Sequence, residues 1–268
     1  MSRVIAVSNQ KGGVAKTTTV INLGASLAAA ERRVLVIDAD PQANLTSGLG
    51  LRSEQARKTL YDVLLDGVPL ADTLLDTDLP GLRVAPADRH LTGAEIELVS
   101  QEARDTRLRT ALAPLREEFD YVLIDSPPSL GLLTVNALTA SDNVLIPLQA
   151  EYFALEGVSE LVGTIRRLQA GPSAGLDVLG VVLTMVDERT NLSQQVRDEV
   201  RAHFGDKVFK TQVPRNVRLA EAPSFGKPVL LYDVRSRGAK AYLALAQEVL
   251  SHEKTRPREG AVRTTAGG

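Results

Sequence analysis

The chain has 268 residues, of which 44% are hydrophobic and 24% charged, and its net charge is −2. Length and composition are typical of a globular protein, and with 4% aromatic residues and no Trp the core must be aliphatic. Cysteine is absent, which excludes disulfides, thiolate zinc sites, iron–sulfur clusters and a cysteine nucleophile. There is no apolar run of about 18 residues and no basic-then-apolar leader, so we expect a cytoplasmic protein.

Short β-branched runs alternate with longer helical patterns along most of the chain. Strands are expected at residues 4–8, 34–38, 82–85, 121–125, 144–147, 178–184 and 208–213, and helices at 17–30, 59–65, 105–118, 132–140, 155–169, 192–204 and 240–250. Most strand runs are continuously apolar, as in strands covered on both faces. The pattern predicts an α/β fold with a doubly wound, mostly parallel sheet and flanking helices.

Residues 1–251 are expected to form a single domain, because no shift in composition marks a boundary within them. Residues 52–92 are loosely patterned and are expected to be surface structure. Residues 252–268 are polar, rich in Gly, Pro and Thr and without apolar periodicity, so we expect this tail to be disordered.

A glycine-containing turn, Asn9-Gln-Lys-Gly-Gly-Val-Ala-Lys-Thr-Thr-Thr19, joins the first strand to a helix. Such a turn lets backbone N–H groups converge on a phosphate, and the helix dipole favours the same negative charge. Lys16 would reach the β- and γ-phosphates, and the Thr17 hydroxyl would bind Mg²⁺. Gln10 and Ala15 replace the glycines of an ordinary Walker A motif, and the segment fits the deviant pattern K-G-G-x-x-K-[ST], with an extra lysine at Lys11. The alternative is a plain glycine turn with exposed lysines.

Aspartates end two other expected strands. Asp38-Ala-Asp-Pro-Gln ends the second strand, and Asp125-Ser-Pro-Pro-Ser ends the strand at 121–125. A carboxylate beside a phosphate loop suits the outer shell of hydrated Mg²⁺, although a single aspartate before Pro or Ser also caps turns routinely. Three carboxylates at two strand ends, together with the phosphate loop, favour a nucleotide–Mg²⁺ site.

These segments resemble the deviant Walker ATPases, and Gln149–Gly157 and Pro214–Lys227 resemble in particular the ParA/Soj partitioning ATPases of the MinD/ParA superfamily. The resemblance extends from Arg3 to Leu250. It implies an ATPase, weak until a partner stimulates it, that uses ATP and Mg²⁺. It also implies a face-to-face homodimer with two ATP molecules at the interface, which binds double-stranded DNA without sequence preference. The implied partner is a ParB-type centromere-binding protein, and the implied location is the nucleoid, with no membrane attachment.

The resemblance also implies roles for individual residues. Lys16 and Thr17 would hold the phosphates and Mg²⁺, Lys11 would reach the nucleotide of the partner subunit, and Asp40 would orient the attacking water. Asp125 would lie in the switch that senses the γ-phosphate and would contribute, with Thr17, to the metal site. The expected ATP-binding residues are Lys11, Gly12, Gly13, Val14, Ala15, Lys16, Thr17, Thr18, Met185, Pro214 and Asn216. The last three would frame the adenine base, and Met185 could equally be a core residue.

Basic charge is concentrated towards the end of the chain, where residues 201–268 contain 13 Lys and Arg but only 6 Asp and Glu. Such asymmetry suggests an anionic partner. By resemblance, Arg189 and Arg218 occupy DNA-contacting positions, and Arg215 and Lys227 add charge in the same region. Phosphate contacts need charge and reach rather than base-edge chemistry, which suits binding without sequence preference. Each arginine by itself could be an ordinary solvated residue.

Ala15 departs from the family, in which many members have glycine at this position. If φ there is positive, alanine costs about 1 kcal/mol relative to glycine. Two other functions stay open: a MinD-like positioning ATPase, although the C-terminal segment has no apolar face, and a small-molecule ATP-dependent ligase, which would bind no DNA. No helix-turn-helix segment precedes the first strand, so sequence-specific DNA binding is not expected.

Overall fold

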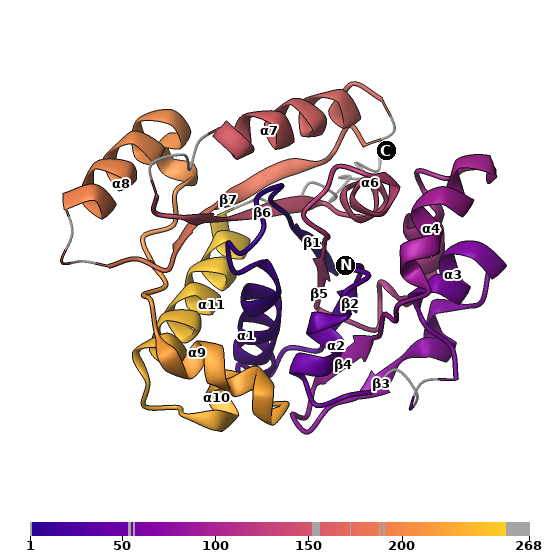
Figure 1. The fold of residues 1–268 in the computed structure, drawn as a ribbon, viewed down its shortest axis with the longest axis horizontal. Coiled ribbons are helices and arrows are strands. Elements are labelled where there is room, and N and C mark those ends of the chain that lie inside the picture. The colour runs from indigo at the N-terminus through magenta and orange to yellow at the C-terminus, as the bar shows by residue number, and fades with distance from the viewer. Residues whose placement is uncertain are drawn as a thin grey trace, which may run out of the picture.

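A seven-stranded sheet with the order β3-β4-β2-β5-β1-β6-β7 forms the centre of the structure (Figure 1). The structure is a computed structural model that describes residues 2–52, 55, 57–151, 156–171, 173–187, 189 and 191–255. The strands are β1 (Arg3–Val7), β2 (Val34–Asp38), β3 (Leu75–Asp76), β4 (Leu82–Ala85), β5 (Tyr121–Asp125), β6 (Asn143–Gln149) and β7 (Asp177–Thr184). Only the short β3 pairs antiparallel among these strands, so the expected doubly wound, mostly parallel α/β fold is confirmed.

Helices cover both faces of the sheet. The α-helices are α1 (Lys16–Ala29), α2 (Asn44–Gly48), α3 (Leu60–Asp66), α4 (Leu91–Glu97), α5 (Arg107–Leu112), α6 (Leu132–Thr139), α7 (Glu156–Gln169), α8 (Asn191–Phe204), α9 (Val217–Glu221), α10 (Val229–Tyr232) and α11 (Arg237–Thr255). Alternate residues of β1 point to opposite faces of the sheet. Ile5 and Val7 pack with α1 and α11 on one face, whereas Val4 and Ala6 pack with helices from α3 to α8 on the other. Figure 1 shows α1 and α11 lying side by side on the first face.

The register of the central strands brings their carboxyl ends to one line. Val7 of β1 pairs with Asp125 of β5, and Asp125 pairs in turn with Asp38 of β2. Two aspartates from distant parts of the chain therefore lie on neighbouring strands, next to the point where β1 leads into α1. Ligands of open parallel sheets bind at this edge.

The expected strand at residues 208–213 is wrong. Phe209 N and Val213 N donate to carbonyls of β7, at 2.9 and 2.8 Å, but only isolated bridges form there. Between them, the backbone N–H groups of Lys210 and Thr211 donate to the carboxylate of Glu248 on α11, at 2.7 and 2.9 Å. A side chain from a distant helix thus takes the donors that a strand ladder would have used.

Other sequence predictions need smaller corrections. The helix expected at 105–118 is shorter, since α5 ends at Leu112 and a 3-10 turn, η4 (Ala113–Leu115), follows; Pro114 has no N–H to continue an α-helix. Residues 52–92 are not only surface structure, because Leu60, Leu64 and Leu70 are fully buried. Helix α11 continues to Thr255, past the expected boundary at 251, and residues 256–268 lie outside the described residues. No helix among the described residues is both long and apolar enough to cross a membrane.

Candidate active site

The turn between β1 and α1 forms an open cradle at the sheet edge. Gly13 has φ 75° and Ala15, the N-cap of α1, has φ 66°, so both lie in the left-handed region. Helix α1 has no side-chain cap and no acidic residue in its first turn, which leaves its first N–H groups and the positive end of its dipole for an anion. A Cβ atom added at Gly12 or Gly13 would meet nothing within 4 Å. The space beside the Cα atoms of these two glycines is therefore open among the described residues.

Side chains from the neighbouring strands hold this loop in place. Buried Asn9 donates from Nδ2 to the Pro147 carbonyl at 2.8 Å and accepts from Lys11 N at 3.0 Å. Thr184, at the end of β7, donates to the Val14 carbonyl at 3.1 Å. Sequence reasoning missed Asn9 and Thr184; the available signal was a polar residue at the end of a buried strand.

Lys16 lies almost buried in the middle of this cradle, with 7% of the residue exposed. Its Nζ donates to the Lys11 carbonyl at 3.2 Å. Burial lowers the pKa of Lys16, whereas the nearby carboxylates of Asp125 and Asp40 raise it. A phosphate bound at the end of α1 would add negative charge beside the ammonium and so stabilise its protonated form.

Asp125 presents an unsatisfied oxygen to the same space. Thr17 Oγ1 donates to Asp125 Oδ2 at 2.6 Å, while the buried Oδ1 has no hydrogen-bond partner in the part of the chain that the structure describes. Burial, and the neighbouring charge of Asp38, raise the pKa of Asp125 well above its ordinary value. A divalent cation would offset both costs, and Mg²⁺ characteristically binds one or two protein oxygens together with phosphate oxygens and water. Thr17 and Asp125, the expected metal residues, therefore lie together in an arrangement that fits Mg²⁺.

The two aspartates that follow β2 have different environments. Asp38 is buried and accepts hydrogen bonds from Thr46 N at 2.9 Å, Thr46 Oγ1 at 2.6 Å and Asp40 N at 3.3 Å. Burial raises the pKa of Asp38 to about 6. The residue Asp40 is 8% exposed, and its Oδ1 accepts a hydrogen bond from Gln42 N at 2.9 Å. Asp38 thus anchors its loop, and Asp40, like Asp125, lies close enough to Lys16 to raise the pKa of that lysine.

Lys11 extends away from the cradle. Its Nζ forms an ion pair with Glu151 Oε2 at 3.1 Å, in which the two side chains are 37% and 48% exposed. An exposed pair of this kind contributes less than about 1 kcal/mol, so it would open at little cost if Lys11 were to reach the nucleotide of a second subunit. Glu151 belongs to the motif Gln149–Gly157, of which residues 152–155 lie outside the described residues.

Comparisons with known proteins decide the family. A family model described as an AAA domain matches residues 2–178. The chain is 57% identical over 261 residues to the chromosome partitioning protein ParA of Caulobacter vibrioides, covering 97% of this chain and 98% of that protein. It is 54% identical over 252 residues to the sporulation initiation inhibitor protein Soj of Bacillus subtilis, covering 94% and 100%. The chain belongs to the ParA/Soj family of partitioning ATPases. The expected resemblance is thereby confirmed.

A solved structure of related fold bears on the ligands of this ParA/Soj ATPase. Cobyrinic acid a,c-diamide synthase from Mycobacterium smegmatis, with a bound ATP analog and magnesium, is 40% identical and superimposes with a TM-score of 0.84, covering 95% of this chain and 97% of that one. The ligands of that structure agree with the expected cofactors, ATP and Mg²⁺. Because that protein is named a synthase, the alternative of a small-molecule ligase stays open.

The residues expected to frame adenine converge at the end of β7. Met185 has φ 51° and is half-buried; the next residue, Val186, forms a parallel bridge with Pro214. Asn216 follows two residues later and uses its Oδ1 to cap α9, accepting from Arg218 N at 3.0 Å. Because Thr184 is bonded to the P-loop, this group lies on the side of the cradle towards β7.

The four residues expected to contact DNA are exposed, but two of them are paired with carboxylates. Arg189 binds Asp187 through Nε at 2.9 Å and Nη2 at 2.7 Å, which lowers the pKa of Asp187 to about 2. Arg218 on α9 binds Glu221 at 2.8 Å and Asp233 at 3.4 Å. Arg215 lies close enough to Asp187 to lower its pKa as well, and Lys227 is exposed just before α10. In this chain, two of the four basic residues, Arg189 and Arg218, are thus held in place by ion pairs with acidic side chains.

Proposed function

We propose that this ATPase acts as a nucleotide-controlled DNA-partitioning switch in the cytoplasm, on nucleoid DNA. With ATP and Mg²⁺ it forms a homodimer that binds double-stranded DNA without sequence preference. Hydrolysis, stimulated by a ParB-type centromere-binding protein, separates the subunits and releases the DNA. The observation that carries the nucleotide part is the uncapped start of α1, with Lys16 beside it and with the unpartnered Oδ1 of Asp125 next to Thr17.

Within this mechanism each group has a distinct task. The amides of the P-loop and Lys16 bind the phosphates, and Thr17 with Asp125 holds Mg²⁺, which neutralises charge on the phosphates when bound. Asp40 orients the attacking water, and Lys11, once released from Glu151, contacts the nucleotide of the second subunit. A cation supplied by the other subunit stabilises charge that develops on the transferring phosphoryl group, so hydrolysis depends on dimerisation.

The ATP dependence of DNA binding follows from the weakness of one basic surface. Arg189, Arg215, Arg218 and Lys227 offer few charges per subunit, and Arg189 and Arg218 already share theirs with acids. Two such surfaces joined in a dimer gain avidity without any new contact. The relatives named as chromosome partitioning proteins support this function for the whole chain, whereas the similarity to a synthase favours a small-molecule ligase as the second candidate.

The test is binding of the full chain to a random-sequence duplex at two salt concentrations, with ATP–Mg²⁺, with ADP–Mg²⁺ and without nucleotide. We expect tight, salt-sensitive binding with ATP only, because contacts to phosphates release counterions. A second duplex of different sequence should bind equally. Absence of DNA binding in every state, with ATP bound normally, would favour the ligase, and ATP-dependent binding to anionic vesicles in its place would favour a MinD-like function.

A further inference from the structure

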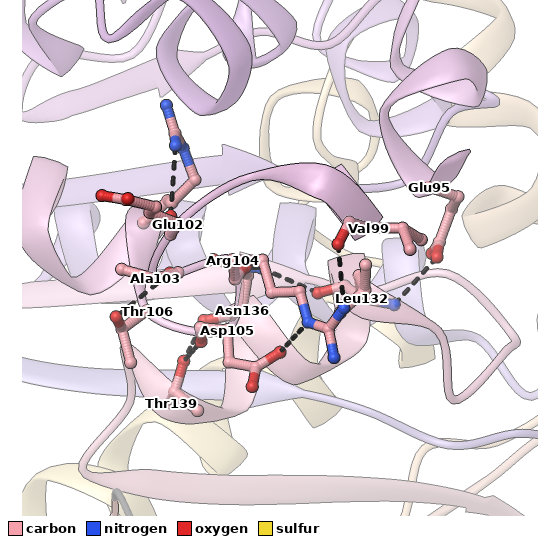
Figure 2. Close-up of polar contacts among 11 residues, drawn as sticks. Glu95, Val99, Glu102, Ala103, Arg104, Asp105, Thr106, Leu132, Asn136 and Thr139 are labelled. Carbon is pink, nitrogen blue, oxygen red and sulfur yellow. Dashed lines mark hydrogen bonds and ion pairs between the residues drawn. The ribbon is translucent and has the colours of Figure 1, made fainter. Parts of the chain in front are cut away.

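Helix α6 begins close to the nucleotide site but is capped by a residue from another helix. Its own N-cap residue, Gly131, offers no side chain. Glu95 on α4 fills this place: Leu132 N donates to Oε2 at 2.8 Å and Leu133 N to Oε1 at 3.2 Å. Figure 2 shows the Glu95 carboxylate directed at Leu132. A carboxylate here satisfies two helix amides that would otherwise lack partners and interacts favourably with the helix dipole.

The segment between Asp125 and α6 is fixed at both ends. At the nucleotide end, Thr17 binds Asp125, and Ser126 Oγ donates to the Val7 carbonyl at 3.1 Å. Pro128 and Ser129 in the middle are exposed. At the far end, the Glu95 carboxylate accepts from the first two amides of α6. Thr134 Oγ1 of α6 also donates to the Ser129 carbonyl at 2.5 Å. The six residues 126–131 therefore form a short strap that is held by α6, and Glu95 fixes the first turn of that helix.

The remainder of α6 is held independently of Glu95. Asn136 Nδ2 donates to the Arg104 carbonyl at 2.6 Å, and Asn136 Oδ1 accepts from Leu108 N at 3.1 Å. Thr139 Oγ1 donates to the Asp105 carbonyl at 2.5 Å. Figure 2 shows the contacts of Asn136 with Arg104 and of Thr139 with Asp105, where residues of α6 meet the segment before α5. Loss of the Glu95 carboxylate would thus loosen the first turn of α6 and the end of the strap that leads into it, while leaving the rest of the helix in place.

We propose that Glu95 is a positioning residue for ATP hydrolysis: it anchors the start of α6 so that the strap at residues 126–131 stays beside the γ-phosphate position, next to Asp125. This inference rests on the proposed ATPase mechanism. A strap that samples more conformations meets the reacting phosphate in the productive geometry less often, so turnover falls while binding of the nucleotide to the P-loop is retained.

Gly131 provides a second, independent way to disturb the same contact. A Cβ atom added at Gly131 would overlap both carboxylate oxygens of Glu95. Because these oxygens are the end of a flexible side chain, Gly131→Ala would push the carboxylate away from Leu132 and Leu133 without altering any charge. In a Glu95→Ala background the same Cβ would meet no carboxylate.

The experiment compares Glu95→Gln, Gly131→Ala, Glu95→Ala and the double variant Glu95→Ala/Gly131→Ala in the full chain, measuring ATPase kcat and the affinity for ATP. The control is Glu97→Gln, which removes an equal charge from the same helix at an exposed residue whose carboxylate accepts from the Tyr61 hydroxyl at 2.9 Å. For Glu95→Gln and Gly131→Ala we expect kcat to fall about tenfold or more, as happens when a residue that orients a site group without touching the ligand is changed. The ATP dissociation constant should change less than about twofold. Hydrogen exchange of residues 126–133 should rise.

The double variant distinguishes a shared contact from two unrelated defects. Gly131→Ala should have no further effect once Glu95 is alanine, since variants of one contact are not additive. An unchanged kcat in Glu95→Gln, or additive losses in the double variant, would overturn the proposal. A loss of ATP affinity equal to the loss of kcat would overturn it as well. If the wild-type chain itself hydrolyses no ATP, the proposed function fails. If the wild type and Glu95→Gln hydrolyse ATP equally well, the proposed function stands and only the role of Glu95 fails.

Discussion

Ala15 occupies a backbone conformation that suits glycine, since its φ of 66° and ψ of 34° are left-handed. The cost of placing alanine there is about 1 kcal/mol, and the sequence comparison with glycine-bearing family members anticipated it. The conformation is retained because the flanking residues hold the loop, with Val14 bonded to Thr184 and Lys16 folded onto Lys11.

Ala15→Gly should stabilise the protein against unfolding by about 1 kcal/mol, which for a chain of this size raises Tm by about 2–4 °C. The matched control is Ala244→Gly, the same chemical change at an exposed position within α11, which should lower stability by about 1 kcal/mol. Thermal unfolding of the nucleotide-free protein measures both. Equal destabilisation by the two changes would show that the left-handed conformation of Ala15 carries no cost.

The buried carboxylates Asp38 and Asp125 link stability to pH. Burial raises the pKa of Asp38 from 3.8 to about 6, and burial and the charge of Asp38 raise the pKa of Asp125. Between pH 4 and the raised pKa values, the folded chain holds protons that the unfolded chain releases. The free energy of unfolding of the nucleotide-free protein should therefore fall as pH rises from 4 through 6, by up to about 1.4 kcal/mol per pH unit for each group.

Asp125→Asn removes one of these titrations and one of the two neighbouring charges. Its unfolding free energy, measured with urea from pH 4.5 to 8, should depend less steeply on pH than that of the wild type, and the variant should be the more stable protein at pH 8. The same substitution should weaken Mg²⁺-dependent ATP hydrolysis. An identical pH dependence in both proteins would mean that Asp125 stays ionised in the folded state.

At the scale of elements, the sequence predicted the strands that lie inside the sheet better than the segment at its margin. Runs such as residues 34–38 and 121–125 are apolar on both faces, which few structures other than a covered parallel strand can accommodate. The segment 208–213 is apolar only at its two ends, and its amides at Lys210 and Thr211 are bound by Glu248. Nothing local in the sequence reveals a competitor that lies 37 or 38 residues away on α11.

Glu248→Gln should show how much this competitor contributes. An amide in place of the carboxylate can accept from only one of the two N–H groups, so we expect a loss of about 1–2 kcal/mol in unfolding free energy. Glu199→Gln, at an exposed position of α8, is the control and should stay within about 0.5 kcal/mol of the wild type. Hydrogen exchange at residues 208–213 should rise in Glu248→Gln and not in Glu199→Gln. If it does not rise in Glu248→Gln, the contacts with β7 rather than Glu248 keep this segment ordered.

At the scale of the whole molecule, the fold decides on which surface each basic residue of the sequence lies. Helices α9 and α10 lie on the sheet face that carries α1, whereas α7 covers the opposite face (Figure 1). The exposed Arg218 on α9 and the exposed Arg166 on α7 therefore lie on opposite faces of the sheet, although the two side chains are chemically the same. Asn22 on α1 also accepts a hydrogen bond from Val229 N at 2.7 Å, which ties the P-loop helix to the start of α10.

Arg218→Glu should abolish ATP-dependent DNA binding while nucleotide-dependent dimerisation is retained, because Arg218 lies on α9 and not at the P-loop. Arg166→Glu, an equal charge reversal at an exposed position of α7, should leave DNA binding unchanged. Duplex binding and size-exclusion chromatography with ATP–Mg²⁺ measure the two properties. If both variants lose DNA equally, net charge rather than a defined surface governs binding.

The sequence by itself determined the fold class and the phosphate loop, because both depend on local order: apolar runs between helical stretches, and a glycine turn between a strand and a helix. The tertiary structure alone decided what the polar side chains do. Asp38, Asp40 and Asp125 look alike in the chain, yet burial and register make Asp38 an anchor of its loop and bring Asp40 close to Lys16. They leave one oxygen of Asp125 without a partner among the described residues. Likewise, only packing brings Glu95 to the start of α6. Hydrogen bonds and burial between residues distant in sequence depend on how whole elements pack, and no local pattern encodes them.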